Sequence, residues 1–201
     1  MTRHATDQIL LQARLDTTGS AAFADACRAA AAALPGSHLR RAAWSEAAGD
    51  AYGYLDLPER RVLDAADLEP VRAAFAAALP ADAGAQVSRL EKALDLPGAS
   101  DRAEPAFHYV VEMDPADGWR DELLRWYDTE HMPGLASVQG SVQATRLLNH
   151  DHGPLSLACY DLVSPETLGS PDWLVVRGTA WSSRVRPYFT NTKRTMFRTL
   201  A

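Results

Sequence analysis

The sequence contains few of the residues that mark redox, phosphate-binding or hydrolytic sites. Only two of its 201 residues are cysteines, Cys27 and Cys159. Both lie in patterns typical of buried elements, where a thiol serves as a small core side chain. There is no CxxC pair, no glycine-rich phosphate loop and no GxSxG motif. Thiol redox chemistry, nucleotide-dependent chemistry and serine hydrolysis are therefore disfavoured.

Excess positive charge and long apolar runs are also lacking. The formal net charge is −6, so no basic footprint points to nucleic acid or to an anionic membrane as a partner. No apolar run approaches the roughly 20 residues that span a bilayer, and the N-terminus lacks the apolar segment of a signal peptide. With 47% hydrophobic residues, the chain can bury a core. We expect a cytoplasmic globular protein.

The first half of the chain has the pattern strand, helix, strand, strand, helix, strand. Short apolar runs predict the strands, and alanine-rich stretches with one apolar face predict the helices. We expect Asp67 to cap the second helix and Pro80 to end it. The predicted elements are a strand at 9–15, a helix at 20–34, hairpin strands at 38–44 and 51–57, a helix at 68–79 and a strand at 86–93.

The second half repeats this order after a segment rich in proline, glycine and charge at 95–105, which we interpret as a linker. The predicted strands are 107–113, 141–148, 155–162 and 192–199. A βαββαβ unit is the ferredoxin-like motif. The sequence therefore predicts an α+β fold with two tandem ferredoxin-like units, at 1–94 and 106–201, that pack sheet to sheet.

The segment 119–140, WRDELLRWYDTEHMPGLASVQG, has the pattern of an amphipathic helix. Leu123, Tyr127 and His131 recur every four residues, which places them on one face. Trp126 and Glu130 belong to a neighbouring stripe with the same spacing. The pattern predicts an imidazole next to large aromatic side chains.

Pro133 disfavours a helical conformation at the residue before it. We therefore expect the helix to break or kink just beyond His131.

His131 is the strongest candidate for acid/base chemistry, because a histidine titrates near neutral pH. Tyr127, one turn earlier, can contact it, and Trp126 can line a slot for a flat substrate. Glu130 is adjacent in sequence but points about 100° away, so direct contact with His131 is not expected. Alternatively, these side chains only pack the helix onto the sheet.

Two further segments offer polar side chains. In the strand 107–113, alternation separates His108 and Glu112 from the apolar residues. His108 is then either a polar anchor and second base or a strand histidine satisfied by a neighbour. In the basic, aromatic segment 181–198, Arg194, Tyr188 and Asn191 could bind a carboxylate or phenolate, unless the segment is simply a solvated basic edge.

Residues 149–153, NHDHG, contain letters typical of a metal site, but they lie at a predicted hairpin tip without further ligands. We predict no metal there.

The segments WYDTEHMPGLASVQG, SVQATRLL, GPLSLACYDL and RVRPYFTNTKRTMFR together resemble the EthD-like family of dimeric α/β-barrel proteins. The resemblance covers roughly residues 105–199. A turn at Gln139-Gly140 departs mildly from the family's pattern. The resemblance implies a barrel between two ferredoxin-like units, within one chain or in a homodimer, and a site at His131. Relatives include isomerases, cyclases and cofactor-free oxygenases.

Three functions follow from these residues. The first is a cofactor-independent enzyme that acts on a flat aromatic or polyketide-like molecule by isomerisation, cyclisation or oxygenation. His131 is then the acid/base, Tyr127 and His108 orient the substrate, and Arg194 stabilises an enolate or phenolate. The second is an enzyme that uses haem or flavin, with His131 or His108 as the iron ligand for haem. The third is a non-catalytic carrier or oligomerisation module.

Overall fold

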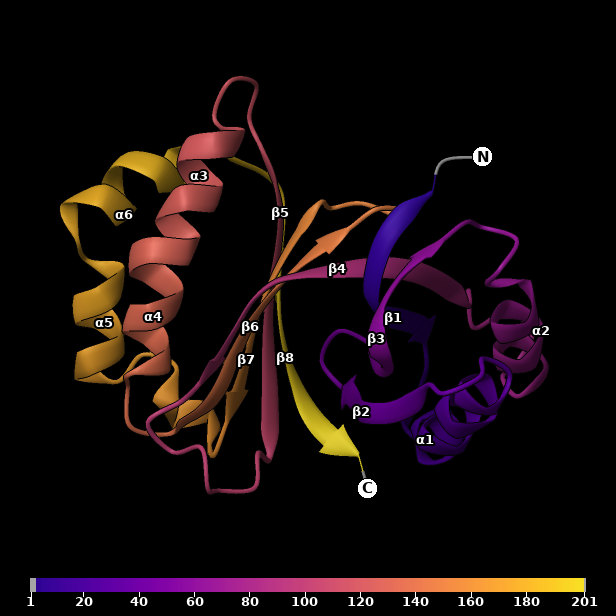
Figure 1. The fold of residues 1–201 in the computed structure, drawn as a ribbon. Helices are drawn as coiled ribbons and strands as arrows, with labels where there is room; N and C mark the ends of the chain where they lie inside the picture. The colour runs from indigo at the N-terminus through magenta and orange to yellow at the C-terminus, as the bar shows by residue number, and fades with distance from the viewer. Residues whose placement is uncertain (1–2, 201) are drawn as a thin grey trace. The chain divides into compact units, whose positions relative to one another are not determined.

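The computed structural model describes residues 3–200 (Figure 1). Its first half contains the elements β1 (His4–Arg14), α1 (Thr17–Ala32), β2 (His38–Ser45), β3 (Asp50–Leu63), α2 (Glu69–Ala77) and β4 (Gln86–Pro97). Its second half contains β5 (Phe107–Pro115), α3 (Arg120–Trp126), the π-helix η1 (Tyr127–His131), α4 (Met132–Ala136), β6 (Ser141–Asn149), β7 (Ser156–Leu162), the 3-10 helix η2 (Pro165–Thr167), α5 (Pro171–Arg177), α6 (Ala180–Val185), the 3-10 helix η3 (Arg186–Tyr188) and β8 (Phe189–Leu200). The predicted order of strands and helices is confirmed.

Several element boundaries differ from the prediction for local reasons. The carboxylate of Asp16 accepts a hydrogen bond from the Gly19 amide at 2.8 Å, so α1 begins three residues earlier than expected. The predicted cap at Asp67 is wrong, because its carboxylate instead accepts from the Asp64 amide at 2.8 Å. Strand β4 runs to Pro97, so the first residues of the predicted linker are part of a strand.

The eight strands form an antiparallel, barrel-like sheet in the order β1-β3-β2-β8-β5-β7-β6-β4. Together with the helices it makes an α+β fold. None of the helices between residues 3 and 200 has the length and apolar composition to cross a membrane.

The chain divides into two compact units. Unit 1 contains residues 1–92, 149–152 and 197–201, and unit 2 contains 93–148 and 153–196. Neither unit is therefore one continuous stretch of sequence, in contrast to the predicted ranges 1–94 and 106–201. The tip of the β6–β7 hairpin and the end of β8 belong to unit 1.

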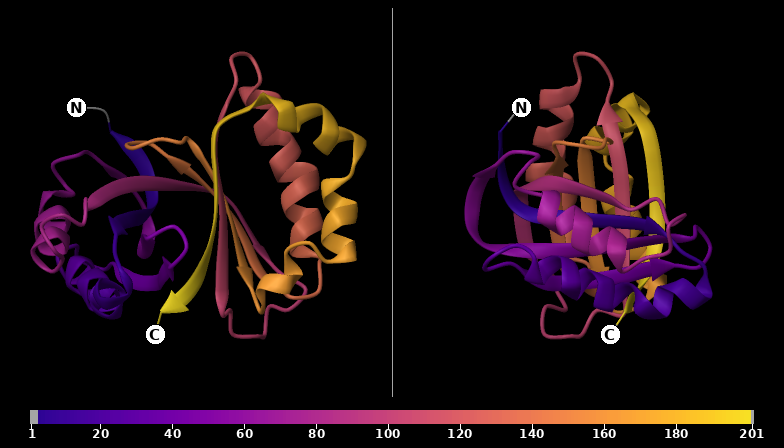
Figure 2. Two further views of the ribbon diagram at one scale, coloured as in Figure 1. Left: turned by 180° about the vertical axis from the view of Figure 1, so that it is seen from behind. Right: turned by 90° about the vertical axis from the view of Figure 1, so that its right-hand side faces the viewer.

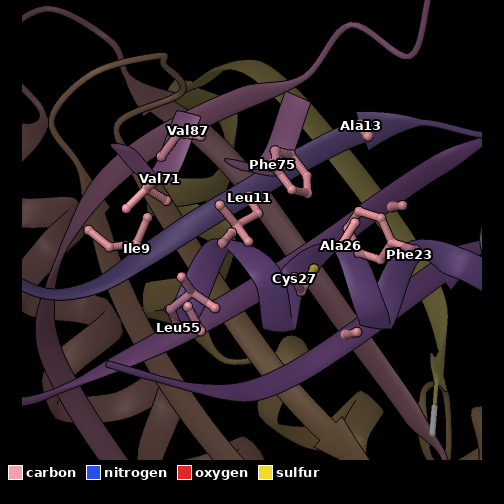
Figure 3. Packing of buried hydrophobic residues seen from close by; sticks show 14 of the residues in the cluster. Ile9, Leu11, Ala13, Phe23, Ala26, Cys27, Leu55, Val71, Phe75 and Val87 are labelled. Carbon is pink, nitrogen blue, oxygen red and sulfur yellow. The ribbon is translucent and has the colours of Figure 1, made fainter. Parts of the chain in front are cut away.

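In unit 1, the strand order is β4-β1-β3-β2, and helices α1 and α2 lie next to each other (Figure 2). Phe23 and Phe75 meet edge to face with ring centroids 5.9 Å apart, and Leu11 and Cys27 lie in the same apolar cluster (Figure 3). Burial raises the pKa of the Cys27 thiol to about 12. Cys27 and Cys159 are both buried in the apolar interior, so the prediction of core thiols is confirmed.

In unit 2, the order β8-β5-β7-β6 corresponds position by position to that of unit 1. Helices α3 to α6 lie on one side of these strands (Figure 1). A second apolar cluster fills the space between them and includes Trp126, Tyr160 and Trp173, which are almost fully buried. The candidate site lies in this layer.

Candidate functional site

The sequence predicts a break or a kink just beyond His131. The segment 120–136 stays helical throughout, so a break is absent, but the helix changes from π to α at this point. Helix α3 passes directly into the π-helix η1, which passes into α4. The Met132 amide donates to the Tyr127 carbonyl, a bond that spans five residues instead of the usual four. A wider turn therefore stands where the sequence predicts an interruption.

Pro133 accounts for this wider turn. Proline has no N–H, and in a regular α-helix its ring clashes with the carbonyl four residues earlier, here that of Thr129. The π turn relieves this conflict without ending the helix. Single π turns of this kind occur frequently at functional sites.

His131 is buried against two aromatic rings. Its imidazole stacks on the Trp126 indole with centroids 4.2 Å apart and an interplanar angle of 23°. Tyr127 meets it edge-on at 5.7 Å, as the four-residue spacing predicts. The Nδ1 atom of His131 is buried and has no hydrogen-bond partner. An unpaired buried nitrogen is costly, so its environment requires an explanation.

The side chain of His131 lines a small cavity. Its volume is about 30 Å³, enough for one or two water molecules. Most of its wall is aromatic or apolar, and three arginines complete it. The lining residues are Tyr109, Val111, Trp126, Tyr127, His131, Leu135, Tyr160, Leu168, Trp173, Arg177, Arg186, Phe189 and Arg194.

Trp173 contributes a second unsatisfied group to the same cavity. Its side chain is 1% exposed, and its Nε1 has no hydrogen-bond partner. Indole N–H is a donor only. A molecule in the cavity that accepts hydrogen bonds would compensate for this loss.

The charges around the cavity are all positive. Burial, followed by the nearby guanidinium groups of Arg177 and Arg186, lowers the pKa of His131 to about 3. The imidazole is therefore neutral at pH 7 and is a weaker base than the sequence predicts, because its protonated form would be desolvated and repelled. Burial also raises the pKa of the Tyr127 phenol, which stays neutral.

Glu130 holds the Trp126 ring in place. Its carboxylate accepts hydrogen bonds from Trp126 Nε1 at 3.2 Å and from Thr179 Oγ1 at 2.7 Å. Glu130 is not among the residues that line the cavity. It thus joins η1 to the start of α6 and acts on the site through the indole.

His108 lies on the other face of strand β5. Tyr109 and Val111 line the cavity with His131, and side chains alternate along a strand. His108 instead is 2% exposed and its Nδ1 lies 2.7 Å from Asp161 Oδ1. The sheet therefore separates the two histidines, and His108 cannot orient a molecule held at His131.

The three residues predicted from the closing segment have different positions. Arg194 lines the cavity. Tyr188 stacks on Trp119 with ring centroids 3.5 Å apart. Asn191 donates from Nδ2 to Asp114 Oδ2 at 2.9 Å. Only Arg194 therefore joins Trp126, Tyr127 and His131 at the cavity.

The sequence interpretation missed several lining residues. Tyr109 belongs to the apolar residues that alternate with His108 and Glu112 along the strand, and this alternation is the signal for its place in the cavity wall. Arg177 and Trp173 belong to α5, which Ser170-Pro171 marks as a helix start. Nothing in that helix pattern alone points to a site.

The hairpin tip at 149–152 makes contacts within unit 1. Asp151 forms hydrogen bonds with the backbone and side chain of Arg89, and His152 Nδ1 lies 3.1 Å from Ser88 Oγ. Within residues 3–200, no group of three metal-ligating side chains is present.

The side chains around His131 do not fit a haem group or a flavin. The cavity of about 30 Å³ is far below the roughly 300–1,000 Å³ of ligand pockets. The indole of Trp126 covers one face of the imidazole, and buried rings fill the remaining space. A smaller aromatic molecule requires less rearrangement, because several lining side chains on the solvent side, including Tyr109, Phe189 and Arg194, are half-buried or exposed.

Solved structures share this fold. A proposed monooxygenase from Lactobacillus acidophilus has a TM-score of 0.63 at 12% identity, over 96% of this chain and 94% of that chain. An anthrone oxidase-like protein has a TM-score of 0.66 at 14% identity, over 98% and 92%. Chlorite dismutase from Candidatus Nitrospira defluvii has a TM-score of 0.58 at 9% identity, over 98% and 92%.

No protein-family model and no curated protein sequence matches the chain. At identities of 9–14%, the structural likeness concerns the fold alone.

Proposed function

We propose that the cavity at His131 is the active site of a cofactor-independent enzyme that oxygenates a flat, electron-rich aromatic molecule. The observation that carries this proposal is the unpaired Nδ1 of His131 in an aromatic-walled cavity. Two neighbours of the fold, one named a proposed monooxygenase and the other anthrone oxidase-like, favour oxygenation over isomerisation or cyclisation.

The proposed reaction begins with proton removal from a methylene group that lies between two aromatic rings, opposite a carbonyl in the central ring, as in anthrone. His131, neutral at pH 7, accepts the proton. The carbanion left behind is delocalised over the ring and reacts with O₂ to form a peroxide anion, which takes the proton back from His131 and becomes a hydroperoxide. Loss of water then converts the methylene into a carbonyl, so that one oxygen atom enters the product and the other leaves in water. The electrons that reduce O₂ come from the oxidised carbon.

The arginines make this proton transfer feasible despite the low basicity of His131. Protonated His131 is disfavoured because it is buried near Arg177 and Arg186. The substrate anion formed in the same step is negative and lies in the same cavity. It offsets the repulsion between these cations, so that base and anion form together.

The test uses anthrone as the probe and follows its conversion to anthraquinone and the uptake of O₂, with the spontaneous reaction subtracted. His131→Phe should lower the rate about 10²–10⁴-fold if His131 is the base. His38→Phe, at an exposed position in unit 1, is the matched control and should retain full activity. Equal rates for wild type and His131→Phe would overturn the assignment.

A non-catalytic carrier is the second candidate, because the lowered pKa of His131 suits a binding group better than a strong base. A carrier would bind anthrone without consuming O₂. Native mass spectrometry and an absorption spectrum of the purified protein complete the test. An added mass or a chromophore matching haem or flavin would contradict the cofactor-free reaction.

We further infer that each unit is a ferredoxin-like βαββαβ unit, since both repeat one order of elements and one strand order. The resemblance to the EthD-like family, and the homodimer that it allows, stay predictions. The same mass spectra report the number of chains.

A further inference from the structure

We infer that the cavity takes its aromatic ligand as an anion, held by the guanidinium groups of Arg177, Arg186 and Arg194. This inference rests on the proposed site but not on the proposed reaction, and it names the chemical class of the ligand. It applies equally to an aromatic carboxylate and to a phenolate or enolate.

The three arginines come from three different elements. Arg177 ends α5, Arg186 begins η3, and Arg194 lies on β8. All three line the same cavity, although they are separated in sequence. The fold of unit 2 therefore brings three positive charges together around one small space.

Within residues 3–200, none of these three side chains forms an ion pair or a hydrogen bond, and no carboxylate lines the cavity. Other arginines of the chain behave differently. Paired examples are Arg14 with Asp50, Arg60 with Asp7, Arg89 with Asp151, Arg146 with Asp128 and Arg184 with Glu122. The cavity thus brings together three arginines that have no carboxylate partner in the described part of the chain.

This arrangement is unfavourable in the absence of an anion. Burial and the charges of Arg177 and Arg194 lower the pKa of Arg186, which reflects the repulsion among the three groups. Like charges without a counter-charge destabilise a fold. A bound anion would remove that cost and would also form charge-assisted hydrogen bonds.

Two unpaired nitrogens in the same wall provide an independent observation. Trp173 Nε1 and His131 Nδ1 are both buried without a partner. The indole can only donate, and the neutral imidazole can donate from one nitrogen. With the arginines, they form a set of donors that suits a ligand rich in acceptor oxygens. The surrounding rings of Trp126, Tyr127 and Phe189 suit its aromatic body.

The test compares 2-naphthoate with its neutral amide, 2-naphthamide, at pH 7.5. Binding is measured by calorimetry and by the fluorescence of the tryptophans in the wall. We expect the carboxylate to bind at least about tenfold more tightly, since hydrogen bonds to charged groups contribute about 1.5–3 kcal/mol. Equal affinities for the two compounds would overturn the inference.

Variants then identify the charges responsible. Arg186→Met should weaken 2-naphthoate at least about tenfold and leave 2-naphthamide nearly unchanged. Arg177→Met provides the same comparison if Arg186→Met does not fold. Arg184 lies two residues before Arg186, and its side chain is 59% exposed. Arg184→Met removes an equal charge outside the cavity and should not alter either affinity. An equal loss for both compounds in Arg186→Met would contradict the inference.

Sulfate and chloride test whether the arginines recognise small anions alone. If sulfate binds as tightly as 2-naphthoate, the aromatic part of the inference is wrong. The anthrone assay separates this inference from the proposed reaction. Selective 2-naphthoate binding without anthrone oxidation would leave the anion site standing and refute the oxygenase. Oxidation at an unchanged rate in the arginine variants, without selectivity for 2-naphthoate, would do the reverse.

Discussion

The imidazole of His131 lies almost flat on the indole of Trp126, with ring centroids 4.2 Å apart, while its Nδ1 has no partner. The ring is thus well packed and poorly hydrogen-bonded. A side chain selected for stability would satisfy both requirements. This combination indicates that the fold keeps an unsatisfied polar group at the cavity although it lowers the free energy of unfolding.

Replacing His131 by phenylalanine should therefore keep the fold intact. The new ring retains the stacking on Trp126 and removes the unpaired nitrogen, whose burial costs about 1–3 kcal/mol. We expect the free energy of unfolding in urea at pH 7.5 to stay the same or to rise by about 1 kcal/mol. A loss of several kcal/mol would mean that the imidazole itself stabilises the fold.

The same variant isolates an acid-dependent contribution to stability. The folded-state pKa of His131 is about 3, below the ordinary value of 6.5, so the unfolded chain takes up the proton first as the pH falls. The stability is complete above pH 6.5 and decreases towards pH 3. At pH 5 the loss should be about 2 kcal/mol. Urea unfolding of wild type and His131→Phe between pH 7.5 and 4.5 should give curves that diverge as the pH falls, because only wild type loses this contribution. Parallel curves would contradict the shift.

Glu130 should affect binding through the position of Trp126. Glu130→Gln keeps an oxygen that accepts from Trp126 Nε1, whereas Glu130→Ala leaves this indole N–H without its partner. We expect Glu130→Ala to weaken 2-naphthoate several-fold and to shift the tryptophan fluorescence, while Glu130→Gln stays close to wild type. If both variants behave alike in both measurements, the hydrogen bond does not set the position of the ring.

Gly53 in β3 should not tolerate a side chain. A Cβ at this position would overlap the Cys27 sulfur, and overpacking a core costs about 1–3 kcal/mol. Thermal unfolding of Gly53→Ala should show this loss. Combining it with Cys27→Ala should recover part of the stability, because the smaller side chain leaves room for the methyl group. Additive losses in the double variant would rule out the overlap as the cause.

Hydrophobic periodicity was sufficient to predict the order of strands and helices. It also predicted that Tyr127 and His131 share a helix face, since that depends only on local geometry. The sequence predicted a break or a kink beyond His131 but not a helix that continues through Pro133, because a π turn can absorb the clash that proline imposes. The role of Asp67 was also wrong, as its carboxylate has a nearer amide partner.

The arginines of the cavity show why the rest of the site could not be predicted. Arg186 and Arg194 lie in the basic segment 181–198, but only tertiary contacts show that Arg177 lies in the same cavity wall. The pKa of His131 likewise depends on burial and on these distant charges. Neither the meeting of these arginines nor the pKa of His131 can be read from the spacing of residues along the chain. Alternation along the strand separates His108 from Tyr109, and in the structure the two side chains lie on opposite faces of the sheet.

Unit 1 contains two segments from the second half of the chain, so a fragment of the first half alone lacks part of this unit. Arg89 is 4% exposed, and the carboxylate that neutralises it is Asp151, from the β6–β7 hairpin. Trp44 in β2 pairs with Arg198 at the end of β8. A fragment ending near Lys92 would therefore keep a buried cation without its counter-charge and a strand without its neighbour. Although the sequence has two successive copies of one pattern, the halves are not interchangeable modules, because folded unit 1 includes the β6–β7 hairpin tip and the end of β8 from the second half.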